Sequence, residues 1–252
     1  KRQGLPVILL NAGLVNRAGP DGVHVRLAGE LAARGSTVLR VDYSGVGDSP
    51  ARRDRTPLDD ARLLETRAVV DWFLADSSAD GVVLAGICTG ADNAFRSALD
   101  DDRVAGVVLL DGYPYRTRGW WLRHYLPRLF RGSSWRTLLR TGLAPPGRPV
   151  ATEDRPAWDG MARKIPSRAE MADQLHALID RGTRLYFIYT GGFSDWVNHA
   201  GQLAAAFPEV PFGDRVTVEY LPDADHVFRP AKSQADLVRC LTGWLKAPGA
   251  AV

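Results

Sequence analysis

One stretch constrains the fold of this chain more than any other: an apolar strand that runs directly into a Gly-x-Cys-x-Gly turn. The strand and the turn are residues 82–90, VVLAGICTG, and a helix-forming run follows from Ala91. A strand-to-helix turn of this kind is the nucleophile-elbow pattern, here with sulfur where Ser is usual. Gly86 and Gly90 leave room for the close crossing of strand and helix. The pattern predicts that Cys88 projects above a sheet near the positive end of the next helix, which favours a thiolate.

A second interpretation of Cys88 stays open at this point. Free cysteines in proteins are usually buried and inert, and short motifs also match by chance. The other cysteine, Cys240, lies on the apolar side of a helix-forming run late in the chain, so we expect it in the core. Two cysteines so far apart do not indicate a disulfide framework, and a reducing cytoplasm is the expected location.

Strand and helix patterns alternate along the chain. We expect strands over Leu5–Asn11, Thr37–Val41, Gly81–Ile87, Val104–Leu110, Leu185–Thr190 and Val216–Leu221. We expect helices over Val23–Arg34, Leu58–Leu74, Ala91–Leu99, Asp195–Phe207 and Ser233–Leu245. Short strands rich in Val, Ile and Leu between helices are typical of an α/β fold, with a mostly parallel sheet covered by helices on both faces. In such sheets functional residues collect at the carboxyl ends of the strands.

Length and composition limit the classes of function. The 252 residues, with 45% hydrophobic and 24% charged residues, are ordinary for one globular domain, so we expect a single domain over 1–252. A formal net charge of +3 is too small to indicate nucleic-acid binding. We see no apolar run long enough to span a bilayer and no signal peptide, although the chain begins at Lys1 without an initiator Met.

The alternation is interrupted once, from Tyr113 to about Thr183, and we expect this insertion, 113–183, to form a helical lid on the same sheet. It is rich in aromatic and basic residues, and no acidic residue occurs between Asp111 and Glu153. Its candidates for binding a substrate or donor are Trp120, Trp121, Tyr125, Arg123 and Arg128. Two other interpretations stay open: a solvated basic helix pair whose aromatic residues pack on the sheet, and a peripheral membrane contact, since Arg with Trp and Leu suits an interfacial helix.

A cysteine nucleophile needs a base and a third residue that orients the base. His226 follows the strand that ends at Leu221 and would take the thiol proton. Asp195 follows the strand that ends at Thr190 and would fix the tautomer of His226. The order nucleophile, acid, histidine is the one that an elbow enzyme requires.

Other carboxylates compete with Asp195 for this role. Asp111 also ends a strand, and Asp223 and Asp225 lie beside His226. Asp195 and His199 are four residues apart on an expected helix and could pair with each other. The remaining histidines have no matching context and are expected at the surface: His24, His124 and His176.

Two backbone N–H groups must meet the oxyanion that develops during acyl transfer. One is expected from Thr89, after the nucleophile, and the other from Leu14 in the loop that follows the first strand, although that loop also fits a plain strand-to-helix turn. The chain has no His-x-x-x-His or Cys-x-x-Cys pair, so we expect no metal. The run 45–47 imitates a dinucleotide loop, but Pro50 occupies its third Gly position, so we also expect no cofactor.

These pieces resemble the α/β-hydrolase superfamily over most of the chain. The matching segments are residues 11–13 (NAG), 42–49 (DYSGVGDS), the elbow, 191–195 (GGFSD) and 223–226 (DADH). More narrowly, residues 86–92 (GICTGAD) look like the Cys-nucleophile hydrolases found beside exosortase and acyl-ligase systems. The superfamily's two opening strands have no counterpart before Leu5, so we expect an amino terminus that is either cropped or reduced.

The resemblance implies an α/β-hydrolase fold with a lid and a Cys-His-Asp triad. A Cys nucleophile that attacks a thioester forms another thioester, so the acyl group stays activated and can pass to an amine, an alcohol or water. We therefore expect an acyltransferase or thioesterase that works through acyl-Cys88, with acyl-CoA or an acyl carrier protein as donor and the lid arginines as its contact. The alternatives are an esterase or dienelactone-type lactone hydrolase, and a non-catalytic binding protein.

Overall fold

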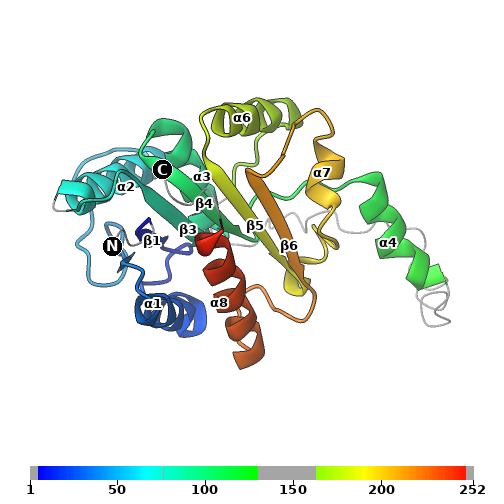
Figure 1. The fold of residues 1–252 in the computed structure, drawn as a ribbon, viewed down its shortest axis with the longest axis horizontal. Helices are drawn as coiled ribbons and strands as arrows, with labels where there is room; N and C mark the ends of the chain where they lie inside the picture. Colours follow the sequence, from blue (N-terminus) through cyan, green and yellow to red (C-terminus); the bar gives the residue numbers. More distant parts are fainter. Residues whose placement is uncertain (1–4, 76, 130–162, 248–252) are drawn as a thin grey trace.

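A computed structural model describes residues 5–75, 77–129 and 163–247, which form one sheet with helices on both faces (Figure 1). The strands, all parallel, lie in the order β2-β1-β3-β4-β5-β6. They are β1 (Val7–Leu10), β2 (Val38–Arg40), β3 (Val82–Ile87), β4 (Val104–Leu110), β5 (Arg184–Thr190) and β6 (Val216–Leu221). The α/β architecture predicted from the alternating patterns is confirmed.

The helices divide between the two faces of the sheet (Figure 1). Their bounds are α1 (Val23–Ala33), α2 (Leu58–Ala75), α3 (Thr89–Asp100), α4 (Arg118–Leu129), α6 (Arg168–Asp180), α7 (Gln202–Ala206) and α8 (Ala231–Lys246). Helices α1 and α8 cover one face, and α2, α3 and α6 cover the other. Helix α4 projects beyond β6 and α7 at the far end of the molecule.

Alternating side chains of each strand build the two cores, because successive residues of a strand point to opposite faces. In β1, Ile8 and Leu10 join the core under α2, α3 and α6, whereas Val7 and Leu9 join the core under α1 and α8. All four side chains are buried, and each contributes about 1.5–3 kcal/mol relative to exposure. Cys240 lies in the α8 core, as the sequence indicated. The sheet is thereby held rigid beneath the loops at its carboxyl edge.

One expected helix is much shorter than its sequence pattern. A helix was expected over Asp195–Phe207, but a 3-10 turn occupies Gly191–Phe193 and the helix α7 begins only at Gln202. The residues between this turn and α7 form hydrogen bonds with α4 instead. The Trp120 indole N–H donates to the Ser194 carbonyl at 3.0 Å, and the Asn198 amide donates to the Trp120 carbonyl at 3.2 Å. Tertiary hydrogen bonds therefore override the local helical spacing.

The expected lid, 113–183, is described only at its two ends. Helix α4 lies at its start and α6 before β5, while residues 130–162 lie outside the described residues. Helix α6 begins with a capping box in which the Ser167 hydroxyl accepts from the Glu170 N–H and the Glu170 carboxylate accepts from the Ser167 N–H. Within the described ranges, no helix is both long and apolar enough to cross a bilayer.

The histidine on α1 was expected at the surface, and this prediction is wrong: His24 is 1% exposed. Burial, together with a smaller effect of the nearby Arg40 charge, lowers its pKa from 6.5 to about 4. The unfolded chain therefore binds a proton at His24 at a pH where the folded chain does not. Stability is present above pH 6.5 and is lost as the pH falls toward 4.

We expect His24→Leu to make unfolding less sensitive to acid. In the native chain, the protonation of unfolded His24 removes roughly 2 kcal/mol of unfolding free energy between pH 7 and pH 5, at about 1.4 kcal/mol for each pKa unit. Urea unfolding of both proteins at the two pH values measures this difference. An equal pH dependence in His24→Leu and the native protein would contradict the assignment.

Candidate active site

The cysteine of the elbow lies in a strained turn between β3 and α3. Cys88 has φ 56° and ψ −119°, a conformation that L-residues rarely adopt. A Cβ on Gly86 would lie 2.2 Å from the Gly90 carbonyl carbon, and a Cβ on Gly90 would lie 2.6 Å from the Asn11 oxygen. Only glycine fits at either position. The expected strand-turn-helix geometry is confirmed, and it sets Cys88 at the carboxyl edge of the sheet.

A histidine and a buried carboxylate meet at the same edge. His226, in the loop after β6, lies with its Nδ1 2.8 Å from Oδ2 of Asp111. Asp111 directly follows β4 and is completely buried. His226 also lies beside the Cys88 thiol, close enough that each group shifts the pKa of the other. The three side chains thus form a chain of contacts from sulfur to imidazole to carboxylate.

The carboxylate of Asp111 is fixed by three donors. The Thr190 N–H donates to Oδ1 at 2.8 Å, the Thr190 hydroxyl donates to Oδ2 at 2.7 Å, and His226 occupies Oδ2 as well. Thr190 is the last residue of β5, the neighbour of β4, so the sheet itself supplies the donors. These donors satisfy the hydrogen-bonding capacity of a polar side chain that is fully buried.

Two glycines let the β5 loop approach the loop that carries His226. A Cβ on Gly191 would lie 1.9 Å from the backbone oxygen of Pro222, and a Cβ on Gly192 would lie 2.5 Å from the backbone nitrogen of His226. The Phe193 ring then stacks on the His226 ring, with centroids 5.7 Å apart. This packing fixes the plane of the imidazole between Cys88 and Asp111.

The expected acid, Asp195, does not reach His226, and this assignment is corrected. Its side chain is exposed, and its carbonyl accepts from Arg116 Nε at 3.0 Å. The 3-10 turn after β5 carries Asp195 past the histidine, whereas Asp111 comes directly off the adjacent strand. The two acids beside His226 form surface ion pairs, Asp223 with Lys232 and Asp225 with Arg229.

The neighbours of Cys88 favour its thiolate. Burial raises the pKa of the thiol, but the His226 hydrogen bond, the charge of Arg163 and the Thr89 N–H outweigh burial, so the pKa of Cys88 lies below its ordinary value. The hydrogen bonds to Asp111 and Cys88 raise the pKa of His226 to about 9. Burial and the nearby Glu219 raise the pKa of Cys240 to about 11. The surroundings of Cys88 therefore favour a thiolate, whereas those of Cys240 disfavour one.

Sequence reasoning missed Arg163, whose guanidinium lies among residues around Cys88, Asp111 and His226. Both Asp92 oxygens accept from its guanidinium at 2.7 Å, one helical turn after Cys88. Its Nη1 donates to the Asp111 carbonyl at 3.2 Å, and its Cζ lies 6.0 Å from the centre of the Phe193 ring. The spacing of four residues between Cys88 and Asp92 could have indicated that Asp92 lies near the site. Arg163 lies in an aperiodic stretch that gives no signal.

The loops expected to form the oxyanion site are bonded to each other. The Gly13 N–H donates to the Thr89 hydroxyl at 2.8 Å, so the β1 loop lies against the start of α3. The Thr89 N–H is one of the groups that lower the pKa of Cys88. Among the described residues the Leu14 N–H has no hydrogen-bond partner. Both expected donors, Thr89 and Leu14, lie next to the site, and their role toward a substrate stays a prediction.

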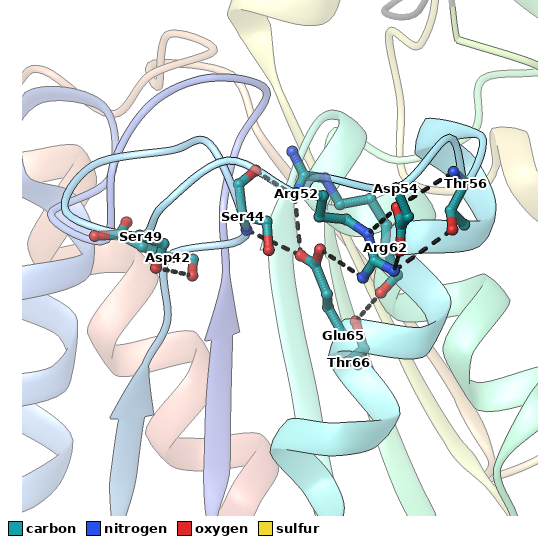
Figure 2. A network of polar contacts seen from close by, with 9 residues as sticks. All are labelled: Asp42, Ser44, Ser49, Arg52, Asp54, Thr56, Arg62, Glu65 and Thr66. Atoms are coloured by element: carbon teal, nitrogen blue, oxygen red, sulfur yellow. Dashed lines mark hydrogen bonds and ion pairs between the residues drawn. The ribbon is translucent and has the colours of Figure 1, made fainter.

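A network behind the β1 loop holds it in place. Asn11 is buried, accepts from the Tyr43 N–H at 2.8 Å and donates to the Asp42 carboxylate at 3.1 Å. Figure 2 shows how residues 42–49 are tied in turn to α2. The Ser49 hydroxyl donates to the Asp42 carbonyl at 2.7 Å, and the Ser44 N–H donates to the α2 residue Glu65 at 3.0 Å. The loop after β1 is therefore held in position by bonds within the protein itself.

A cavity of about 700 Å³ adjoins the site on this oxyanion side. Its lining includes Gly13, Leu14, Thr89, Tyr113 and Arg163. Cys88 and His226 are not part of its lining, so the cavity meets the site beside the sulfur. Within the described ranges, no three His, Cys, Asp or Glu side chains are grouped as a metal site.

The lid residues expected to bind substrate have other neighbours. Trp120 is 2% exposed and anchors α4 through its bond to Ser194, while Trp121 stacks on Tyr125 at 5.4 Å. These three and the exposed Arg123 are absent from the cavity lining. The side chain of Arg128 lies outside the described residues. Their binding role stays a prediction.

The comparisons agree with this architecture. A family model described as the alpha/beta hydrolase fold matches residues 6–134. Because the match spans more than half of the sequence, this chain belongs to the α/β-hydrolase fold family. No curated protein matches the sequence.

Solved structures resemble the chain in fold. An esterase of Pyrococcus furiosus has a TM-score of 0.61 at 15% identity, covering 97% of this chain and 82% of that one. A thermophilic esterase of Thermogutta terrifontis has a TM-score of 0.60 at 21% identity, with 97% and 90% covered. A lidless serine hydrolase of Xanthomonas campestris has a TM-score of 0.53 at 18% identity, with 97% and 85% covered. Identities this low carry the fold and not the substrate.

We expect Asp111→Asn to reduce the rate of Cys88 acylation by about a hundredfold to ten-thousandfold, because loss of an orienting carboxylate has this effect in triads. Asp195→Asn is the matched control and should react at nearly the native rate. Acylation rates from intact mass spectrometry compare the two. A larger loss in Asp195→Asn than in Asp111→Asn would return the role to Asp195.

We also expect Arg163→Gln to raise the pKa of Cys88, because the variant removes a positive charge that favours the thiolate. The pH midpoint of Cys88 alkylation by iodoacetamide should move upward. Lys164→Gln changes the next residue, which pairs with Asp59 and not with Asp92, and should leave the midpoint unchanged. A midpoint that does not move in Arg163→Gln would remove Arg163 from the electrostatics of the site.

Proposed function

We propose that this protein is an enzyme that processes acyl thioesters through a covalent acyl intermediate on Cys88. The observation that carries the proposal is the contact chain from Cys88 through His226 to the buried Asp111. A thiol held beside a histidine whose pKa is raised to about 9 supports a thiolate–imidazolium pair near neutral pH. The proposed subtype is that of the Cys-nucleophile hydrolases of exosortase-associated systems, on the motif over residues 86–92.

In the first step, the Cys88 thiolate attacks the thioester carbonyl of the donor. A carbon–sulfur bond to Cys88 forms, the carbon–sulfur bond to the donor thiol breaks, and His226 gives its proton to the leaving thiolate. The N–H groups of Thr89 and Leu14 are the proposed donors to the oxyanion of the tetrahedral intermediate. Asp111 holds the imidazole in the tautomer that these transfers require.

In the second step, neutral His226 takes a proton from water, an amine or an alcohol as that acceptor attacks acyl-Cys88. The bond between the acyl carbon and Cys88 then breaks, and the thiolate–imidazolium pair is restored. Sulfur favours thioester donors because the exchange is nearly balanced in energy, whereas a Ser nucleophile would form a less activated ester. An acyltransferase and a thioesterase differ only in this acceptor.

The proposed donor is acyl-CoA or an acyl carrier protein, both of which are anionic. On α4 and just before it, Arg116, Arg118 and Arg123 have no carboxylate partner among the described residues, and Arg suits phosphate groups well. The same helix exposes Trp121, Leu122 and Leu126, with exposed fractions of 44%, 62% and 45%. These apolar side chains favour a second possibility, a peripheral membrane contact.

Intact mass spectrometry after incubation with acyl thioesters tests the proposal. We expect one acyl adduct, mapped to Cys88, that is lost in Cys88→Ala and retained in Cys240→Ala. Cys88→Ser should react much more slowly with thioesters. Acylation by a CoA thioester should slow as salt rises, because salt screens attraction to the arginines, while a neutral N-acetylcysteamine thioester should show little change.

Each alternative has a distinct result in the same assay. Faster turnover of small oxygen esters or lactones than of thioesters would identify an esterase or lactone hydrolase. A Cys88 that reacts with none of these and resists alkylation would indicate a non-catalytic binding protein. Equal salt dependence for both thioesters would remove the arginines as a donor contact, and vesicle flotation would then test the membrane contact.

A further inference from the structure

The cavity beside Cys88 is lined along one face of α3. Thr89, Asn93 and Arg96 all line it, and they are spaced at i, i+4 and i+7. This spacing places them on one side of a helix. At 1.5 Å per residue, Thr89 and Arg96 are about 10 Å apart along the helix axis. An acyl group on Cys88 that entered the cavity at Thr89 and followed this face of α3 would pass Asn93 and reach Arg96.

Three of the carboxylates that line the cavity are already engaged. Asp92 is bonded through both oxygens to Arg163. Glu170 accepts from the Ser167 N–H at 2.8 Å. Asp59 is shared by two cations, with Lys164 at 2.7 Å and Arg96 at the longer distance of 3.6 Å. Because a guanidinium has five N–H donors, this one long contact leaves most donors of Arg96 without a partner among the residues that the structure describes.

The chemistry of the lining favours an acyl chain with a polar end over a plain alkyl chain. Charged and apolar side chains share the lining, and a purely apolar chain would remove water from the charged ones without replacing its hydrogen bonds. A chain that ends in an acceptor replaces that water. A carboxylate fits best, because it can take two parallel hydrogen bonds from one guanidinium.

We propose that this cavity is an acyl subsite for a short acyl group that ends in a carboxylate, bound by Arg96. The inference rests on the proposed function, since it names the class of acyl group carried by Cys88. It assigns Arg96 as a specificity residue, with the Asn93 amide as a second donor along the chain.

The glutaryl and pentanoyl thioesters of CoA test this proposal, because they share a carbon skeleton and differ only at the end of the chain. We expect the native protein to form the glutaryl adduct at least about tenfold faster than the pentanoyl adduct, as one good charged contact would provide. Arg96→Gln should abolish this preference, and Arg96→Lys should retain part of it. Arg67→Gln, an exposed arginine on the neighbouring helix α2, is the matched control and should keep it.

A second readout needs no turnover. Free glutarate should slow the alkylation of Cys88 by iodoacetamide more than pentanoate does, and Arg96→Gln should remove the difference. A preference for pentanoyl, or one that Arg96→Gln leaves unchanged, overturns the subsite. Protection by glutarate with no acyl adduct from any thioester would overturn the proposed function and keep the subsite. Acyl adducts on Cys88 without an Arg96-dependent preference would support the proposed function and overturn the subsite.

Discussion

The hydrogen bond between Asp111 and His226 is the interaction on which the rest of the site depends. Asp111 is fully buried, and a buried polar side chain is stable only when hydrogen-bond partners satisfy it. Thr190, the last residue of β5, supplies two of those donors, and His226 supplies the third. Because the carboxylate holds the imidazole at Nδ1, the other ring nitrogen faces sulfur. The position of His226 beside Cys88 therefore follows from the pairing of β4 with β5.

Backbone strain at the site is supported by the sheet beneath it. Cys88 and Asp111 both adopt positive φ directly after a strand, a conformation that costs on the order of 1–3 kcal/mol. The Cys88 N–H donates to the Leu110 carbonyl at 2.9 Å, and the Asp111 N–H donates to the Ile188 carbonyl at 2.9 Å. These ladder bonds continue β3, β4 and β5 into the strained turns. Arg163 adds a further connection, since it joins the helix after Cys88 to the backbone of Asp111.

The parallel sheet, the elbow and the histidine were predictable because each leaves a local pattern: apolar strands, paired glycines and a polar loop after a strand. The orienting acid was not separable from its rivals, since Asp111 and Asp195 both follow strands in the sequence. Their difference arises from the 3-10 turn after Thr190 and from the bonds between α4 and residues 194–198, which are tertiary effects. Arg163 was beyond prediction because its contacts with Asp92 and Asp111 cross more than 50 residues without periodicity.

The protonation of His226 tests the central claim most directly, because it reports the coupling of sulfur, imidazole and carboxylate without a substrate. Nitrogen chemical shifts of the His226 ring, followed by NMR across pH, give its apparent pKa and its tautomer. We expect a pKa near 9 in the native protein, with both ring nitrogens protonated at neutral pH, and a lower pKa in Asp111→Asn. A neutral ring at pH 7, with a pKa near the ordinary value of about 6.5 that Asp111→Asn leaves unchanged, would contradict the account.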